Sequence, residues 1–366
     1  MTEFKFDPRL ARADAPVAKA EDIAFVMFRR PDLALMSKFM TDFGMTEVEC
    51  TPERLVMRGA RQLGPAHVTW KADKPGFRGL ALRVRDEADL QALAKLPGAS
   101  VVEPLDLPGG GSHVRLTDPA GFDVWAVYGQ AAIATDELRS PIPANTTEEL
   151  ERLNAGVRPP AIPATVLRPG HCVLGAIEFF ATAQWYIQTF GLIPSDIQYL
   201  DDGSPALTFL RCDRGETPAD HHTVVVSQNI VNTYSHSAYE VIDLDDVAMG
   251  QEHLLSRGWK HAWGVGRHLL GSQIFDYWRD PYGDKVEHYA DGDRFEASVE
   301  TGHSLLNSAG LYQWGPPVPK DFEKPKMSIG FLIKLFSNIK NSKELDFARV
   351  KRLMAAIDAP SRPWQK

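Results

Sequence analysis

The chain has 366 residues, of which 44% are hydrophobic and 24% are charged, which predicts a globular protein of about two domains. Its formal net charge is −8 and no basic stripe runs through the body, so we expect no nucleic-acid partner. The apolar runs are far shorter than the roughly 20 residues that span a bilayer, and residues 1–20 lack the apolar core of a signal peptide. Three widely spaced cysteines favour a reducing compartment. We therefore expect a cytoplasmic protein without a membrane partner.

The first part of the chain begins a pattern that later recurs. After an N-terminal segment, 1–19, residues 22–45 predict a strand, a helix and a turn, and residues 79–96 begin a second strand and helix. A D-P-x-G turn at 118–121 then leads into a strand, because its glycine supplies the backbone freedom that the turn needs. We predict a first domain over residues 20–132.

Residues 133–164 read as a linker. They contain five prolines, and each disfavours helix in the residue before it, which predicts extended stretches. One stretch, TTEELERLN at 146–154, is a candidate for a short polar helix.

The second part of the chain repeats the first. Residues 169–192 match 22–45, residues 236–255 match 79–96, and a second D-P-x-G turn occupies 280–283. The repeats predict an α+β fold of four βαβββ units, two in each of two tandem domains, with the second domain over 165–293.

The remaining residues, 294–366, form a C-terminal extension. We expect two helices in it, around 327–339 and 344–358. From Lys320 onward it has 11 Lys/Arg against five Asp/Glu. This basic helical extension could cover an active-site mouth or form a subunit contact.

Three residues with metal-binding character distinguish the second domain from the first. The pairs of matching positions are His171 and Ala24, His236 and Gly79, and Glu287 and Trp125. Two imidazoles and one carboxylate on one face suit non-haem iron(II), because positions stay open for a substrate and dioxygen; manganese(II) can use the same ligands. His288 follows Glu287, and strand alternation sends the two to opposite faces without choosing between them.

Both domains resemble the type I extradiol dioxygenases of the vicinal oxygen chelate (glyoxalase–bleomycin resistance) superfamily. The segments that carry the resemblance are PGHCVL, DHHTVVVS, YSHSAYEV, GRH and FDYWRDPYGDKVEHYADGD. The resemblance implies that the metal ligands are His171, His236 and Glu287.

The same resemblance implies three catalytic residues and a reaction. His222 is the implied acid–base residue, and His268 and Tyr277 lie near the ring hydroxyls. An ordinary imidazole titrates near about 6.5, which suits a group that takes and returns a proton. The substrate would be a catechol chelated to the metal, opened beside its diol by O2 to a yellow muconic semialdehyde. Members commonly form homo-oligomers, so we expect one here.

Other histidines have a plainer interpretation. We expect a structural role for five of them: His67, His113, His253, His261 and His303. His221 is either structural or orients the loop beside His222, and Tyr277 could be a core aromatic residue.

Two substitutions relative to some members indicate the substrate class. Members that act on acidic catechols carry an arginine shortly before the GRH segment and a polar asparagine two residues after the first ligand. This chain has Trp263 and Val173 at those substrate-binding positions. Because they would leave a buried carboxylate unpaired, we predict an alkyl, aryl or polycyclic catechol.

Two alternative functions stay open. A glyoxalase-type lyase or isomerase of the same superfamily would use a metal but need no acid like His222. A non-enzymatic protein that binds an aromatic ligand would lack the metal triad.

Overall fold

The computed structural model describes residues 3–61, 63–133, 136–322 and 329–358. Four successive βαβββ units build its body. The first unit consists of β1 (Ala20–Arg30), α1 (Leu33–Asp42), β2 (Thr46–Cys50), β3 (Arg54–Arg58) and β4 (His67–Lys71). The second consists of β5 (Gly76–Val84), α2 (Glu87–Leu93), β6 (Glu103–Pro104), β7 (Ser112–Thr117) and β8 (Asp123–Tyr128). The third unit consists of β9 (Arg168–Ala176), α3 (Phe179–Phe190), β10 (Ile193–Tyr199), β11 (Pro205–Arg211) and β13 (Val224–Gln228). The fourth consists of β14 (Thr233–Glu240), α4 (Leu244–Ser256), β15 (Lys260–Arg267), β16 (Ile274–Arg279) and β17 (Lys285–Ala290).

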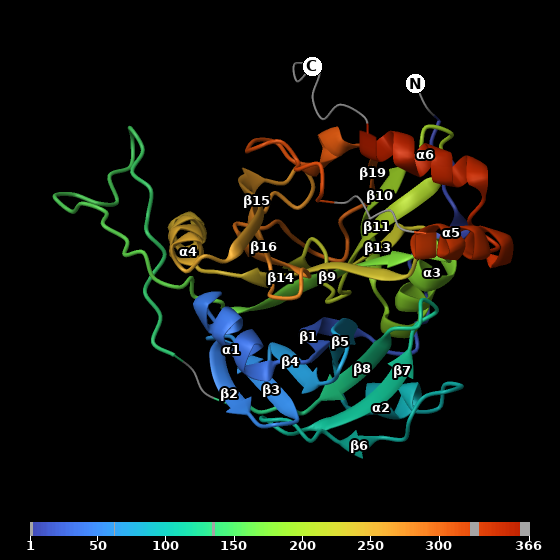
Figure 1. Ribbon diagram of the computed structural model, residues 1–366, viewed down its shortest axis with the longest axis horizontal. Coiled ribbons are helices and arrows are strands. Elements are labelled where there is room, and N and C mark those ends of the chain that lie inside the picture. The colour runs from blue at the N-terminus through green and yellow to red at the C-terminus, as the bar shows by residue number, and fades with distance from the viewer. Residues whose placement is uncertain (1–2, 62, 134–135, 323–328, 359–366) are drawn as a thin grey trace.

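The four units make two large mixed sheets with one topology (Figure 1). The first has the order β2-β3-β4-β1-β5-β8-β7-β6, and in the second the strands β15-β16-β17-β14-β9-β13-β11-β10 follow the same plan. In each sheet the first strands of two units pair antiparallel at the centre, and each pairs parallel with the last strand of its own unit. The predicted α+β fold of repeated βαβββ units is confirmed.

Short elements lie outside the four units. They are η1 (Pro8–Leu10), β12 (Ala219–Asp220), β18 (Arg294–Phe295), β19 (Gly302–Leu305) and η2 (Ser308–Leu311). β19 pairs parallel with β10, so the second sheet gains a strand from residues after 293. The division into domains at 20–132 and 165–293 stays our interpretation.

From residue 136 to residue 164 the linker runs out from the body and back without regular secondary structure (Figure 1). The helix predicted at 146–154 is therefore wrong. Its two leucines, Leu150 and Leu153, are 65% and 72% exposed, so no apolar face is available to stabilise a short helix. The Asn145 side chain instead holds the backbone of Arg152 in an irregular turn.

The two predicted C-terminal helices are confirmed as α5 (Ile329–Asn341) and α6 (Phe347–Asp358). Residues 327–328 of the first prediction lie outside the described residues. In Figure 1 the two helices lie beside the ends of β10, β11 and β13. In the described part of the chain, no helix is long and apolar enough to cross a membrane.

Histidines that pack between the two sheets are structural. His67 is fully buried, bonds to the hydroxyls of Thr69 and Tyr239, and burial lowers its pKa to about 3. His288 Nε2 donates to the Phe43 carbonyl oxygen at 2.7 Å. His288 therefore faces the first sheet, and its neighbour Glu287 faces the opposite side of β17.

A buried ion pair joins the first sheet to the turn before β17. Arg30 and Asp280 have side chains that are 0% and 1% exposed, and Arg30 Nη2 lies 2.7 Å from Asp280 Oδ2 and 2.6 Å from Asp284 Oδ2. Asp280 Oδ1 also accepts the backbone N–H groups of Tyr282 and Asp284. Arg30 thus neutralises the carboxylates of the D-P-x-G turn that precedes β17.

Replacing Arg30 by alanine should strongly destabilise the protein. The change leaves the Asp280 carboxylate buried without its cation, so we expect the free energy of unfolding in urea to fall by about 3–5 kcal/mol. Arg85→Ala is the control, since the Arg85 side chain is 53% exposed in its pairs with Asp86 and Asp89. It should cost less than about 1 kcal/mol. Equal losses in the two variants would contradict the role given to Arg30.

Candidate metal centre and active site

Three neighbouring strands of the second sheet hold the predicted metal ligands. His171 is on β9, His236 on β14 and Glu287 on β17, and β14 lies between the other two strands. Ala238 of β14 pairs in register with both His171 and Glu287. The three side chains therefore project from the same face at nearly the same level.

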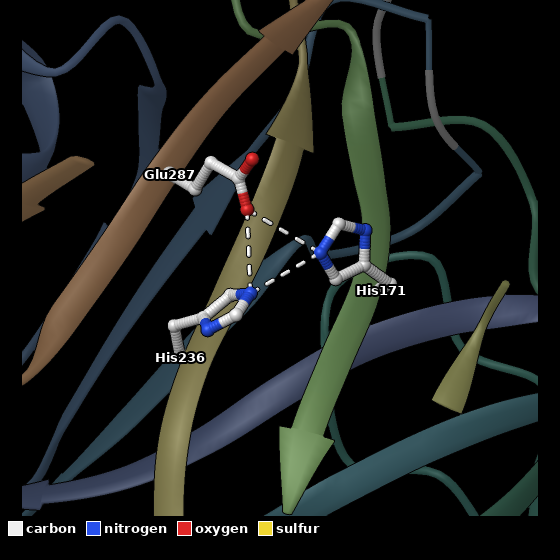
Figure 2. A group of neighbouring side chains, drawn as sticks. All are labelled: His171, His236 and Glu287. Carbon is white, nitrogen blue, oxygen red and sulfur yellow. Dashed lines mark hydrogen bonds and ion pairs between the residues drawn. The ribbon is translucent and has the colours of Figure 1, made fainter. Parts of the chain in front are cut away.

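The donor atoms of these residues converge on one point (Figure 2). His171 Nε2 and His236 Nε2 lie 3.3 Å apart, and each lies 3.3 Å from Glu287 Oε2. Adjacent ligands of an octahedral divalent ion with bonds of about 2.1–2.3 Å are roughly 3.0–3.3 Å apart. The triad therefore fits such an ion, with the opposite coordination positions open.

The surroundings of Glu287 also indicate a cation. Its side chain is fully buried, and neither carboxylate oxygen has a hydrogen-bond partner among the described residues. Burial raises the carboxyl pKa, but the rings of His171, His236 and His268 outweigh burial and lower the pKa well below its usual range. A buried carboxylate that stays ionised needs a positive partner.

Burial favours the neutral form of two nearby imidazoles, His236 and His222. It lowers the pKa of His236 to about 4, although the Glu287 carboxylate opposes the shift. Burial also lowers the pKa of His222 well below its ordinary value, and the rings of His171 and His221 lower it further. Neutral imidazole is the form that binds metals and accepts protons.

A chain of hydrogen bonds orients His222. Asp196 Oδ2 lies 2.7 Å from His221 Nε2, and His221 Nδ1 lies 2.9 Å from His222 Nδ1. The carboxylate accepts the Nε2–H of His221, so His221 Nδ1 accepts the Nδ1–H of His222. His222 therefore presents Nε2 as an acceptor, and its ring centroid is 4.1 Å from that of His171.

The other two predicted catalytic residues bond to each other. His268 Nδ1 donates to the carbonyl oxygen of Leu311 at 2.6 Å, so His268 Nε2 is the acceptor for the Tyr277 hydroxyl at 2.9 Å. His268 Nε2 also lies 3.5 Å from Glu287 Oε1. The C-terminal extension, through Leu311, thus fixes the orientation of His268.

All predicted site residues except the fully buried Glu287 line one cavity of about 1030 Å³. Val173 lies on β9 two residues beyond His171. Trp263 is only 3% exposed, stacks on Tyr277 with ring centroids 5.6 Å apart, and donates its indole N–H to the Pro316 carbonyl oxygen.

The sequence did not indicate Asp196, and it left open whether the C-terminal extension covers the mouth of the site. Asp196 is a lone acidic residue on β10, with no motif around it. The outer cavity wall comes from residues 306–322 and from α6 in the C-terminal extension. Neither Asp196 nor the outer wall could be assigned to the site without knowing which distant segments of the chain meet in space.

The five histidines expected to be structural all have protein partners. The partners are Thr69 and Tyr239 for His67, Glu103 for His113, Asp42 for His253, Asp276 for His261 and Tyr199 for His303. None of these five histidines lines the cavity.

Comparison with known proteins finds a similar sequence. The chain is 29% identical over 322 residues to metapyrocatechase 2 of Cupriavidus necator. The aligned region covers 85% of this chain and 95% of that protein. The chain therefore resembles this metapyrocatechase over most of its length. No protein-family model matches the sequence.

Solved structures show the same fold at lower identity. An extradiol ring-cleaving dioxygenase from Brevibacterium fuscum matches with a TM-score of 0.70 and 16% identity, over 86% of this chain and 85% of that chain. An Mn(II)-bound glyoxalase from Novosphingobium aromaticivorans matches with a TM-score of 0.69 and 20% identity, over 86% and 97%. Extradiol dioxygenases and this glyoxalase therefore share the vicinal oxygen chelate fold with the chain.

Removing a predicted ligand should abolish tight metal binding. We expect His236→Ala and Glu287→Gln to weaken binding of Fe(II) and Mn(II) by more than the roughly 10- to 100-fold that loss of an outer-sphere partner costs. Anaerobic calorimetric titration of the metal-free protein measures this. His261→Ala is the matched control, because His261 bonds to Asp276 and lies outside the cavity lining. Wild-type affinity in both ligand variants would rule out this triad.

Proposed function

We propose that this chain is an extradiol ring-cleaving dioxygenase that uses iron(II) to insert both atoms of O2 into a catechol with an apolar substituent. One observation carries the proposal. The triad of His171, His236 and Glu287, of which His171 and Glu287 are buried, has one side open to a cavity, and the neutral imidazole of His222 lies beside that open side. The relationship to metapyrocatechase supports the same activity.

The bound metal supplies the Lewis acid that acidifies the catechol hydroxyls and the electron route between ring and oxygen. The protein supplies proton handling and orientation. His222 Nε2, held as an acceptor by the chain through His221 and Asp196, takes a proton at the substrate and returns it later. His268 and Tyr277 hydrogen-bond the diol hydroxyls or the O2 that reacts with the ring carbon next to them.

The cavity walls favour an apolar ring substituent. Val173 and Trp263 line the cavity beside the triad, and neither side chain can pair with a carboxylate. Arg279, which also lines the cavity, pairs with Asp321 at 3.3 Å. A carboxylate on the substrate would therefore lose its hydration at this wall without an equivalent partner.

The same ligand set also accepts manganese(II), so the choice of iron is part of the proposal. The compartment is part of it as well. Cys50, Cys172 and Cys212 are all free thiols, which fits a reducing cytoplasm. Assembly into a homo-oligomer stays a prediction.

Oxygen consumption tests the proposed activity. The metal-free protein is loaded anaerobically with Fe(II), then mixed in air with catechol, 3-methylcatechol or 2,3-dihydroxybiphenyl. We expect one O2 per diol and a yellow product. His222→Asn should bind the metal normally and lower kcat by roughly 10²–10⁴-fold, because it lacks the acid–base group.

His236→Ala serves as the inactive control for this assay. Tight metal binding without oxygen uptake on any diol would exclude the dioxygenase and favour a glyoxalase-type lyase or isomerase, which consumes no oxygen. A strong preference for homoprotocatechuate over the 3-substituted and biaryl catechols would contradict the apolar substituent alone.

Asp196 should act by positioning His222. Asp196→Leu removes the acceptor for His221, so we expect His222 to lose its fixed tautomer and kcat to fall about tenfold or more, with KM for catechol near the wild-type value. Asp196→Asn keeps one acceptor oxygen and is the matched control. Nitrogen NMR of the metal-free protein reports the His222 tautomer directly. An unchanged tautomer in Asp196→Leu would show that Asp196 has no such role.

A further inference from the structure

The cavity extends well beyond the space that a catechol ring needs at the metal. Its lining follows β9, β13 and β11 away from the triad, from His171 to the levels of Ser227 and Leu207. Ser227 pairs in register with Gly175, four residues along β9 from His171. At about 3.3 Å per residue, this part of the cavity is roughly 13 Å long.

The far wall of this extension is mostly apolar and belongs to α6, whose last residue, Asp358, also lines the cavity. Leu353, Met354 and Ile357 of α6 line the cavity, and Leu306 lines it from the segment after β19. Leu353 is buried against Leu200 and Ala206, whereas Met354 and Ile357 are 38% and 42% exposed. Two apolar side chains therefore remain partly open to water on the wall of a cavity, where an apolar ligand would cover them.

Polar contacts made by two arginines of α6 hold this wall in place. Arg349 donates to the Gln228 side chain, the Ser204 hydroxyl and the Pro205 carbonyl oxygen. Arg352 pairs with Asp201 and Asp202. The helix is thus fixed to the ends of β11 and β13, which carry the inner cavity lining.

Charged residues also line the cavity, and those on β16, on β17 and in the turn between them are engaged within the protein, whereas Lys260 and Lys320 are exposed. Arg279 pairs with Asp321, and Lys285 Nζ donates to the Phe322 carbonyl oxygen at 2.9 Å. Asp284 pairs with the buried Arg30. The α6 side, by contrast, presents aliphatic side chains and suits a hydrocarbon.

We propose that α6 forms the end wall of a second subsite, which takes a long alkyl or aryl substituent of the ring-cleaved diol and selects substrates by its length. The inference rests on the proposed function and names the substrate class: catechols with an extended hydrocarbon substituent. It assigns substrate selection to a C-terminal helix more than 60 residues beyond the last metal ligand.

A series of 3-alkylcatechols tests the subsite. With the Fe(II)-loaded full-length protein, oxygen uptake is measured for catechol and for its methyl, butyl and octyl derivatives. Each buried methylene contributes about fourfold in affinity, so KM should fall at least tenfold from methyl to octyl. A catechol with a carboxylate at the end of a chain of similar length should bind worse than the octyl compound; the reverse order would overturn the proposal.

Two substitutions locate the subsite on α6. Met354→Asp and Ile357→Asp place a charge on partly exposed positions, so the fold should tolerate them. We expect each to raise KM for octylcatechol at least tenfold and to leave KM for catechol unchanged. Ile333→Asp on α5 is the matched control, since Ile333 is 66% exposed and outside the cavity lining. If the α6 variants bind octylcatechol like the wild type, the assignment to α6 is wrong.

A binding measurement separates this inference from the proposed reaction. 4-Octylphenol cannot chelate a metal through a diol, and its binding to the metal-free protein can be followed by calorimetry. Binding that Ile357→Asp abolishes and Ile333→Asp preserves supports the subsite even if no diol consumes oxygen. Absence of binding to the wild-type protein, or equal binding to all variants, overturns the subsite whatever the assay of oxygen uptake shows.

Discussion

The buried carboxylate of Glu287 is the constraint around which this protein is organised. A carboxylate with no exposed surface and no hydrogen-bond donor on either oxygen is costly unless a cation compensates it. His236 Nε2 lies 3.3 Å from the carboxylate, and burial lowers the pKa of His236 to about 4, so this neighbour does not supply that charge. The free energy of burying Glu287 is therefore coupled to metal binding.

The rest of the sheet serves this geometry. The triad needs three adjacent strands at one level, and the central strand pairing of the βαβββ repeat provides them. The β16–β17 turn is anchored from the other sheet by Arg30, which pairs with Asp280 inside the protein. The first sheet has no ligand residues at the matching positions Ala24, Gly79 and Trp125, but it supplies this anchor. The second copy of the fold therefore holds the candidate metal ligands, and the first copy stabilises the turn that positions one of them.

Hydrogen bonds from residues that are not metal ligands orient the two histidines beside the triad. Asp196 and His221 hold His222 with its acceptor nitrogen available, and the Leu311 carbonyl oxygen does the same for His268. One of these contacts comes from β10 and the other from the C-terminal extension. The segments that orient the proposed catalytic groups are therefore separate from the strands that hold the metal ligands.

The sequence by itself predicted the repeat and the fold class, and the repeat showed that His171, His236 and Glu287 match non-ligating residues of the first domain. The resemblance to a known family, and not strand alternation, chose Glu287 over His288. The sequence failed at residues 146–154, where local helix propensity had no apolar face to pack. Only the tertiary structure decided that His288 turns toward Phe43, that Asp196 reaches His221 and that α6 walls the cavity. These contacts join segments far apart in the chain, and a single sequence has no local pattern that records such pairings.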